Sequence, residues 1–409
     1  MLTKHILVLS LFTATTFAQS DSTPSPAPPA NAFESPGLVE TKLFLPENLM
    51  KGALHTVNPQ AENDGLLNTY FLSSGDNVVE VTTGIALRIR IRELYAIDKL
   101  RGTSKTEEFT KSLAAAGKQK AQSVAGIVKD PVGTLKRVPQ GASRFFGRIG
   151  EELKGGKSDE SNAVQGLTGV QKAKVALAAK LGVSPYSTNQ ELQEQLTNVA
   201  RATAGGGLVV NAALMPIGAV NTVLNMNQTL QQTLVTTTPD DLRIMNRKKL
   251  LALGATHEIA EEFLMHPWYS PWHETIITDA LATVGRNPTA FLDKACRALT
   301  EQDANYFQRL AQILATYHKT KTPLSSIRIE NDRIAAMDSN GTLVIPLSCD
   351  YVIWSEFAAA RVEAFSQLPQ SRSEIKGLAL WVDGKVSERA AQELKNRKID
   401  LATDVLAKQ

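Results

Sequence analysis

Several signatures of well-defined chemistry are missing from this 409-residue chain. It has no Gly-x-Ser-x-Gly turn, and neither of its two cysteines lies in a known nucleophile motif, so no serine or cysteine hydrolase signature is present. The glycines of 205–207 are not followed by Lys-Ser or Lys-Thr, which excludes a standard phosphate-binding loop. The formal net charge of +3 is too small to indicate nucleic acid. We therefore expect no cofactor and no nucleic-acid partner.

Charge is also missing from the most apolar part of the chain. Residues 202–239 contain no Asp, Glu, Lys, Arg or His, and 205–224 is the centre of this stretch. A helix that spans a bilayer needs about 20 apolar residues, and Asn211, Pro216 and Asn221 interrupt this segment. Burial in a helical core is the favoured interpretation, and a membrane-inserted hairpin or a ligand pocket are the alternatives.

The N-terminus has the pattern of a secretory signal. Lys4 and His5 precede an apolar run, 6–17, which is too short to span a bilayer. Small residues before the predicted cut place cleavage near Ala18, so 1–18 is a signal peptide and the mature protein is periplasmic or secreted. The alternative is an uncleaved anchor.

Export bears on the two cysteines, Cys296 and Cys349. An oxidising compartment would allow them to form a disulfide bond between two elements that are not neighbours in sequence. Two free, buried thiols are the alternative, because unpaired cysteine is commonly buried.

Composition and periodicity divide the rest of the chain into five segments. Short alternating runs predict strands near both ends of the mature chain, and capped helices lie between them. The fold class is therefore α+β, mainly helical, with a small N-terminal antiparallel sheet, a central helical domain and a C-terminal α+β cap. The segments are a disordered Pro/Ser-rich tether (19–37), a β-rich unit ending in a helix (38–103), a basic amphipathic helical segment with a linker (104–162), the central helical domain (163–323) and the C-terminal cap (324–409).

In the β-rich unit, runs at 53–57, 67–72 and 77–82 alternate as strands do. The next segment fits either a strand or a helix, and we favour a helix over 85–100. Its alternating arginines are then expected to form a solvated face.

Helix starts are well marked in the central domain. Ser187 and Glu191 suggest a capping box, and Pro or acidic residues follow several Ser and Thr residues. The predicted helix-starting residues are Thr238, Thr256, Ser270 and Thr300.

The C-terminal cap shows mixed patterns. Two helices are predicted, at 351–367 and 387–398. The predicted strands are 327–330, 333–336, 342–347, 377–382 and 399–401.

Three of the six histidines lie close together in sequence. His257 and Glu261 are four residues apart, so they share a helix face, and His266 and His273 could complete a metal site. The hydrolytic zinc motif requires a second histidine where this chain has Glu261. Surface residues at helix ends are the alternative interpretation.

Aromatic residues make up only 6% of the chain, yet Trp268, Tyr269 and Trp272 cluster beside His273. We expect any binding pocket near these four residues, where the central helices meet the cap. Packing at a helix junction explains the same cluster.

The segment 111–148 is strongly basic and amphipathic, as interfacial helices are. It predicts contact with an anionic membrane surface, and helices with a solvated basic face are the alternative. The membrane-facing candidates are Lys136, Arg137, Arg144, Phe145, Phe146 and Arg148.

Four blocks resemble those of uncharacterised exported proteins of Gram-negative bacteria. They are DPVGTLK (130–136), VPQGASRFFG (138–147), LGVSPYSTN (181–189) and PWYSPWHET (267–275). The resemblance covers roughly 50–365. It implies export and a shared architecture, and it brings no activity or catalytic residue with it.

These observations favour a non-enzymatic binding or structural module at the cell envelope, with an anionic membrane surface or an envelope protein as its partner. One alternative is a hydrolase, with or without a metal, that uses the 257–273 neighbourhood. Another is a membrane-associated or pore-forming protein.

Overall fold

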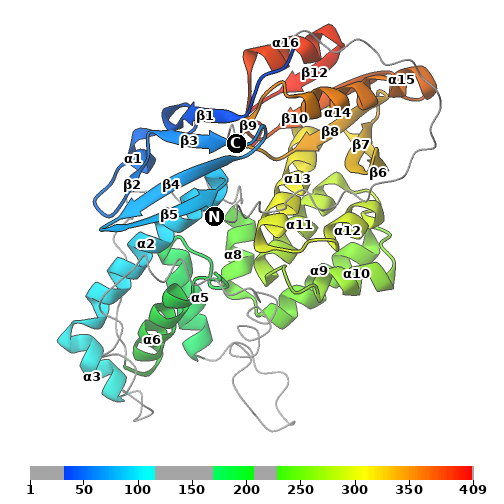
Figure 1. Ribbon diagram of the computed structural model, residues 1–409. Helices are drawn as coiled ribbons and strands as arrows, with labels where there is room; N and C mark the ends of the chain where they lie inside the picture. The colour runs from blue at the N-terminus through cyan, green and yellow to red at the C-terminus, as the bar shows by residue number, and fades with distance from the viewer. Residues whose placement is uncertain (1–31, 116–168, 207–227, 408–409) are drawn as a thin grey trace.

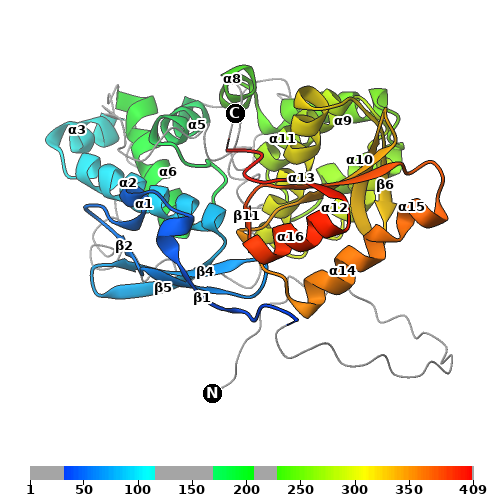
Figure 2. The same ribbon diagram turned by 90° about the horizontal axis from the view of Figure 1, so that it is seen from above.

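The computed structural model describes residues 32–115, 169–206 and 228–407 (Figure 1). It is an α+β fold, mainly helical, with an antiparallel sheet near the N-terminus and a mixed sheet near the C-terminus. Figure 2 shows the chain as two lobes that lie side by side. The predicted fold class is therefore confirmed.

The N-terminal lobe combines an antiparallel sheet with helices. The sheet has the order β1-β3-β4-β2, and β5 pairs with the other edge of β4, so that Tyr70 lies opposite Val81. Its strands are β1 (Gly37–Glu40), β2 (Thr56–Val57), β3 (Gln60–Asn63), β4 (Asn68–Ser74) and β5 (Asn77–Thr82). Its helices are η1 (Thr41–Leu43), α1 (Glu47–Met50), α2 (Gly84–Ser104), α3 (Glu107–Ala115), α5 (Gly169–Leu181) and α6 (Gln190–Gly206).

Helix α2 holds this lobe together, because its N-terminal and C-terminal parts pack on different partners. Leu87, Ile91 and Leu94, at helical spacing, join the core under the sheet. Ile97 and Leu100, further along the helix, join the core shared by α3, α5 and α6. The sequence correctly predicted a helix here. Its arginines do not form a solvated face, however, since Arg92 is 5% exposed.

The C-terminal lobe packs helices on both faces of a mixed sheet. The order is β12-β10-β8-β7-β6, with β8, β10 and β12 parallel and the remaining pairs antiparallel. A separate parallel pair joins β9 to β11. The strands are β6 (Leu324–Glu330), β7 (Arg333–Asp338), β8 (Thr342–Leu347), β9 (Tyr351–Val352), β10 (Gly377–Val382), β11 (Lys385–Val386) and β12 (Ile399–Ala402). The helices are α9 (Pro239–Ala252), α10 (His257–Leu264), α11 (Pro271–Val284), α12 (Thr289–Ala295), α13 (Glu301–Thr320), α14 (Glu356–Ser366), α15 (Leu368–Ser371) and α16 (Glu388–Asn396).

Alternation along the strands explains why both faces of this sheet are covered. On β7, Ile334 and Ala336 join the core with α11 and α13, whereas Ala335 and Met337 face the core with α14 and α16. The Tyr317 ring of α13 packs against Trp381 of β10, with ring centroids 4.7 Å apart. A sheet that is buried on both faces needs apolar residues at successive positions, as β8 and β10 have.

The helices of the predicted central domain belong to two cores. Helices α5 and α6 pack in the N-terminal lobe, whereas α9 to α13 pack with the C-terminal sheet. Helix α8 (Gln228–Thr236) contacts both α5 and α11 and lies between the lobes. The predicted helix starts at Thr238, Thr256, Ser270 and Thr300 are confirmed.

Three local predictions need correction. The strand predicted over 53–57 is reduced to β2, and the helix predicted over 351–367 begins only at Glu356, capped by Ser355. Helix α6 is capped by Asn189, whose Oδ1 accepts the Leu192 N–H at 3.2 Å, rather than by Ser187.

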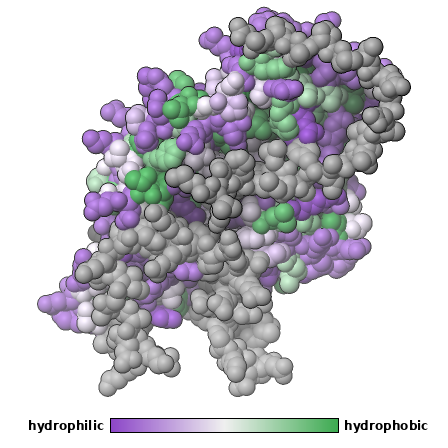
Figure 3. Space-filling model, in the orientation of Figure 1, coloured by the Kyte–Doolittle hydropathy of each residue, from purple (hydrophilic) through white to green (hydrophobic). Residues whose placement is uncertain are grey.

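Polar residues cover most of the described surface seen in Figure 3, and apolar residues appear there as separate patches. Large exposed apolar side chains come from distant parts of the chain, for example Leu38, Ile244 and Phe357. Within the described ranges, no helix is both long enough and apolar enough to cross a bilayer.

Candidate functional site

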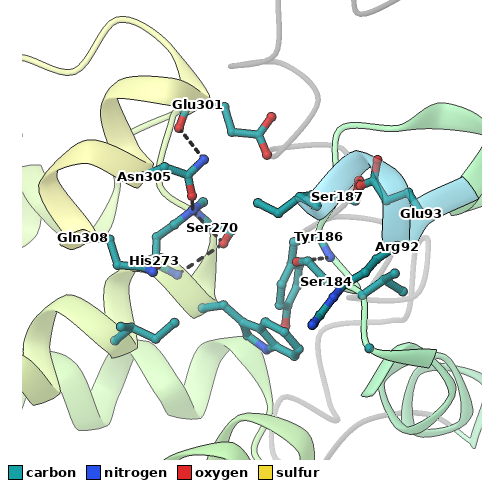
Figure 4. A pocket seen from close by; sticks show the side chains of 15 residues that line it. Arg92, Glu93, Ser184, Tyr186, Ser187, Ser270, His273, Glu301, Asn305 and Gln308 are labelled. Atoms are coloured by element: carbon teal, nitrogen blue, oxygen red, sulfur yellow. Dashed lines mark hydrogen bonds between the residues drawn. The ribbon is translucent and has the colours of Figure 1, made fainter. Parts of the chain in front are cut away.

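A cavity of about 60 Å³ lies where the two lobes meet. Its walls come from α2, from the connection between α5 and α6, and from the N-terminal turns of α11 and α13 (Figure 4). In Figure 4, His273, Asn305 and Gln308 lie on the C-terminal side, and Arg92 and Tyr186 lie opposite them. A water molecule needs about 10–15 Å³ of such space, so the cavity has room for a group of several atoms.

The N-terminal wall is built around Glu93, which is 1% exposed. Its carboxylate accepts hydrogen bonds from Arg90 at 2.7 Å, from Asn189 at 3.2 Å and from the Ser187 hydroxyl. A buried carboxylate is tolerated when it is paired and hydrogen-bonded in this way. Ser187 therefore fixes this acid, which is not the role that the sequence suggested for it.

The C-terminal wall starts with the capping box of α11. The Ser270 hydroxyl accepts the His273 N–H at 3.3 Å, and His273 Nδ1 accepts the Ser270 N–H at 3.2 Å. Because Nδ1 is an acceptor, the ring proton lies on Nε2, which donates to Asn305 Oδ1 at 3.2 Å. Burial lowers the pKa of His273, although Glu301 and Asn305 oppose this effect. The imidazole is therefore neutral at neutral pH.

Two contacts join the walls across the cavity region. The Thr188 hydroxyl donates to Glu301 Oε2 at 2.7 Å. The rings of Tyr186 and Trp272 pack edge to face, with centroids 6.2 Å apart. The cavity is thus held between the lobes by residues of both.

In the C-terminal wall, two buried polar atoms have no hydrogen-bond partner within the part of the chain that the structure describes. They are the indole Nε1 of Trp272, whose residue is 4% exposed, and the amide Oε1 of Gln308, whose residue is 2% exposed. A buried polar group without a partner costs about 1–3 kcal/mol. Both atoms are closed to solvent, so each adds this cost to the packing of the C-terminal wall.

Glu274 lies directly after His273 and is fully buried. Among the described residues neither of its carboxylate oxygens has a hydrogen-bond partner, and Arg243 Nε lies at ion-pair distance, 3.6 Å from Oε2. Burial raises the pKa of Glu274 to about 8, while Arg243 opposes the shift. This side chain is thus mostly protonated at neutral pH.

Only part of the predicted aromatic cluster reaches the cavity. Trp272 and His273 line it. Tyr269 instead donates its hydroxyl hydrogen to Ala295 O at 2.8 Å, and its ring packs at a tilt against Phe263 in the helical core. Trp268 is packed against the same core. Helix-junction packing accounts for Trp268 and Tyr269. The cavity faces the N-terminal lobe rather than the C-terminal cap.

The predicted metal site is not formed. Glu261 is bonded to Arg247, and the exposed His257 lies 4.0 Å from it. His266 packs against the Tyr269 ring, and His273 is held at the capping box. Among the described residues no group of three or more His, Cys, Asp or Glu side chains could hold a metal ion.

Cys296 and Cys349 are both free, so the structure has the two unpaired thiols and not the disulfide. Cys349 is buried and Cys296 is half-buried, and burial raises the pKa of both thiols. The membrane-facing candidates Lys136, Arg137, Arg144, Phe145, Phe146 and Arg148 lie outside the described residues, as do 1–18 and 207–227.

A second, open hollow of about 530 Å³ lies between the N-terminal residues and helices α14 and α16. Its two arginines bond to neighbouring groups. Arg397 donates to Glu393 at 2.6 Å and lies 4.9 Å from the Trp354 ring centroid, and Arg389 donates to the carbonyl of Ala32. These groups are already satisfied, so the cavity between the lobes is the stronger candidate.

The lobes meet again at Asp350, in the connection between β8 and β9. Asp350 Oδ1 accepts the N–H of Gly84, the first residue of α2, at 2.8 Å, and Oδ2 accepts the N–H of Asn68 at 3.0 Å. Asp383, after β10, binds Arg309, Ser348 and the Cys349 N–H nearby. This junction positions α2, and with it one wall of the cavity.

Sequence reasoning missed Arg92, Glu93, Glu301, Asn305 and Gln308. All five are polar residues of α2 or α13, and helix periodicity alone places such residues on an outer face. No local signal shows that a second lobe covers them.

No family model, curated protein or solved structure matches this chain.

Proposed function

We propose that this protein is an exported, non-enzymatic binding module of the cell envelope, which binds a small polar group in the cavity between its lobes. The observation that carries the proposal is the cavity itself, which both lobes line with polar side chains, such as Arg92 and Glu93 from one lobe and His273 and Gln308 from the other. Polar side chains in such a place need hydrogen-bond partners, so the lining favours a polar group as the occupant.

The position of the cavity supports the same function. Ligand sites are common where two domains meet, because both contribute polar groups. Here Arg92 and Tyr186 come from one lobe, and Trp272, His273 and Gln308 come from the other. A ligand in this place would contact both lobes at once and stabilise their arrangement.

The indole N–H resonance of Trp272 provides a direct test, because the chain has only 4 tryptophans. The resonance is assigned from the spectrum of Trp272→Phe, and the full-length protein is then titrated with small polar molecules. We expect at least one class to shift the Trp272 resonance while those of Trp354 and Trp381 stay in place. If none of the molecules shifts it, the proposed function is wrong.

A hydrolase without a metal is the second candidate, favoured by one set of contacts. Ser270 Oγ lies 3.0 Å from His273 Nδ1, and His273 Nε2 contacts Asn305, which is the order of a nucleophile, a base and an orienting group. The capping box uses the same Ser270 and His273 atoms to start α11. Binding is therefore the better supported function, and turnover of ester or amide substrates would reverse this ranking.

A further inference from the structure

We propose that the two lobes pivot at the Asp350 junction, and that a pair of contacts beside the cavity forms a latch that closes it. The latch consists of the Thr188–Glu301 hydrogen bond and the Tyr186–Trp272 ring contact. This motion needs no ligand, so it goes beyond the proposed binding function and is independent of it. The two places where the lobes touch differ in the kind of contact that joins them.

At the Asp350 junction the main chains of the two lobes bond directly to each other. The N–H groups of Asp350 and Tyr351 donate to the Leu66 carbonyl at 3.0 and 3.1 Å. The Ile353 N–H donates to the Gly65 carbonyl at 3.2 Å. The two N–H groups that the Asp350 carboxylate accepts add to these bonds. A change of side-chain rotamer cannot break a main-chain bond, so this junction keeps its geometry.

Apolar packing strengthens the same junction. Leu66 and Leu67 of the N-terminal lobe pack against the core that the C-terminal sheet forms with α14 and α16. The Phe44 ring lies beside the Tyr351 ring, with centroids 5.4 Å apart. Complete separation of the lobes would expose this apolar surface to water, which is unfavourable. A pivot at the junction keeps it buried.

The latch, in contrast, is made of side chains. The Thr188 hydroxyl donates to Glu301 at 2.7 Å, and the rings of Tyr186 and Trp272 meet edge to face. Each contact of this kind changes an equilibrium by about three- to tenfold. Helix α8, joined to α9 through residues 237 and 238, also contacts α5, and this contact would separate with the latch. The lobes therefore part on the latch side.

Opening on that side would expose the cavity, since both lobes contribute to its walls. In the closed arrangement Ile276 of the lining is only 2% exposed. Closure of two domains about a hinge is a common way to enclose a small molecule. The open form would give a polar group access to the cavity, and the latch would then close over it.

A thiol placed in the cavity measures the opening. In Ile276→Cys the new thiol reacts with iodoacetamide only while the cavity is open, so its rate follows the open fraction. Peptide mass spectrometry of the full-length protein separates it from the two native thiols. Cys349 is buried beside Asp350 and reports separation at the junction, and the half-buried Cys296 reports the activity of the reagent.

Thr188→Val, added to Ile276→Cys, removes the hydrogen bond of the latch. We expect it to raise the labelling rate at position 276 about three- to tenfold and to leave that of Cys349 unchanged. Thr197→Val is the matched control, because the Thr197 hydroxyl donates to the Gln193 carbonyl inside α6, away from the other lobe. It should leave the labelling rate at position 276 unchanged.

Asp350→Asn tests the pivot itself. If the junction stays intact in the open form, this substitution destabilises the open and closed forms equally. The labelling rate at position 276 should then remain within about twofold of the rate without it. A rise equal to that in Thr188→Val would overturn the assignment of the pivot to this junction.

Two other results would overturn the proposal. Position 276 would be labelled at the same rate in Thr188→Val and Thr197→Val if the latch did not hold the lobes together. Cys349 and position 276 would be labelled at equal rates if the lobes separated completely or the whole chain unfolded. Each result leaves the binding function to its own test, because no ligand takes part in these measurements.

Discussion

Two buried carboxylates near the lobe interface, those of Asp350 and Glu274, differ in their hydrogen bonding. At Asp350, each oxygen accepts a backbone N–H from the other lobe. At Glu274, neither oxygen has a hydrogen-bond partner in the described ranges, and Arg243 Nε lies 3.6 Å from Oε2. Burial raises the pKa of both, to about 6 for Asp350 and to about 8 for Glu274.

Hydrogen bonding explains much of the difference between these two pKa values. The N–H groups of Asn68 and Gly84 stabilise the charged form of Asp350 and partly offset the effect of burial, although Asp383 opposes them. Gly84 is the first residue of α2, so the partial positive charge of the helix N-terminus also lies at Asp350. The Asp350 junction is therefore a structural contact with its polar groups satisfied. The Glu274 side of the interface keeps unsatisfied groups next to the cavity.

The largest expected effect on the pH dependence of stability comes from replacing the ionisable carboxyl of Glu274. A carboxyl with a raised folded-state pKa contributes stability that is complete below its unfolded pKa of 4.5 and is lost as the pH rises towards about 8. Glu274→Gln keeps the shape and cannot ionise. We expect the wild-type protein to lose up to about 1.4 kcal/mol relative to the variant for each pH unit in this window. Urea unfolding of both proteins across the window measures the difference.

Glu262→Gln is the control for this experiment, because Glu262 is exposed on the neighbouring helix α10. Its unfolding curves should follow those of the wild-type protein at every pH. If the free energies of unfolding of Glu274→Gln and the wild-type protein change in parallel with pH, burial does not disfavour the charged form of Glu274. The difference in pKa between Glu274 and Asp350 would then be contradicted.

A smaller loss is expected when the satisfied junction is broken. In Asp350→Asn the side-chain amide can accept only one of the two N–H groups, and its NH2 group faces the other donor. We expect the free energy of unfolding at neutral pH to fall by about 2–3 kcal/mol. Asp76→Asn, in the exposed turn between β4 and β5, is the control and should change stability little. Equal urea midpoints for the two variants would contradict a structural role for Asp350.

The sequence predicts those parts of the fold that depend on local chemistry. The side chains of Thr238, Thr256 and Thr300 each accept the backbone N–H of the residue three positions later, and such a bond needs only a short segment. Strands β7 and β8 could be predicted from the sequence because their apolar residues are continuous. These features do not depend on which helix packs on which sheet.

Long-range pairing could not be predicted in the same way. Strand β3 is polar, and it is fixed by its neighbours β1 and β4. Tyr351 fits a helical pattern, yet it pairs with Lys385 of β11. Gln308 and Arg92 belong to the cavity only because the other lobe covers them. The site was thus predicted in part, through Trp272 and His273, and its other members follow from the tertiary fold.

The smallest expected loss of stability concerns two helix N-caps, Ser270, which lines the cavity, and Thr256, which does not. Ser270 Oγ accepts the His273 N–H at 3.3 Å, and Thr256 Oγ1 accepts the Ile259 N–H at the same distance. Both Ser270→Ala and Thr256→Ala remove an N-cap, so we expect each to lose about 1 kcal/mol of stability in urea unfolding.

The same two variants separate a structural Ser270 from a nucleophile. If Ser270 serves only to start α11, neither substitution alters the rate at which the full-length protein hydrolyses chromogenic ester and amide substrates, and that rate equals the rate in buffer. A wild-type rate above buffer that is lost in Ser270→Ala and kept in Thr256→Ala would contradict the binding module. It would assign Ser270, His273 and Asn305 to catalysis, because equal losses of stability in the two variants exclude unfolding as the cause.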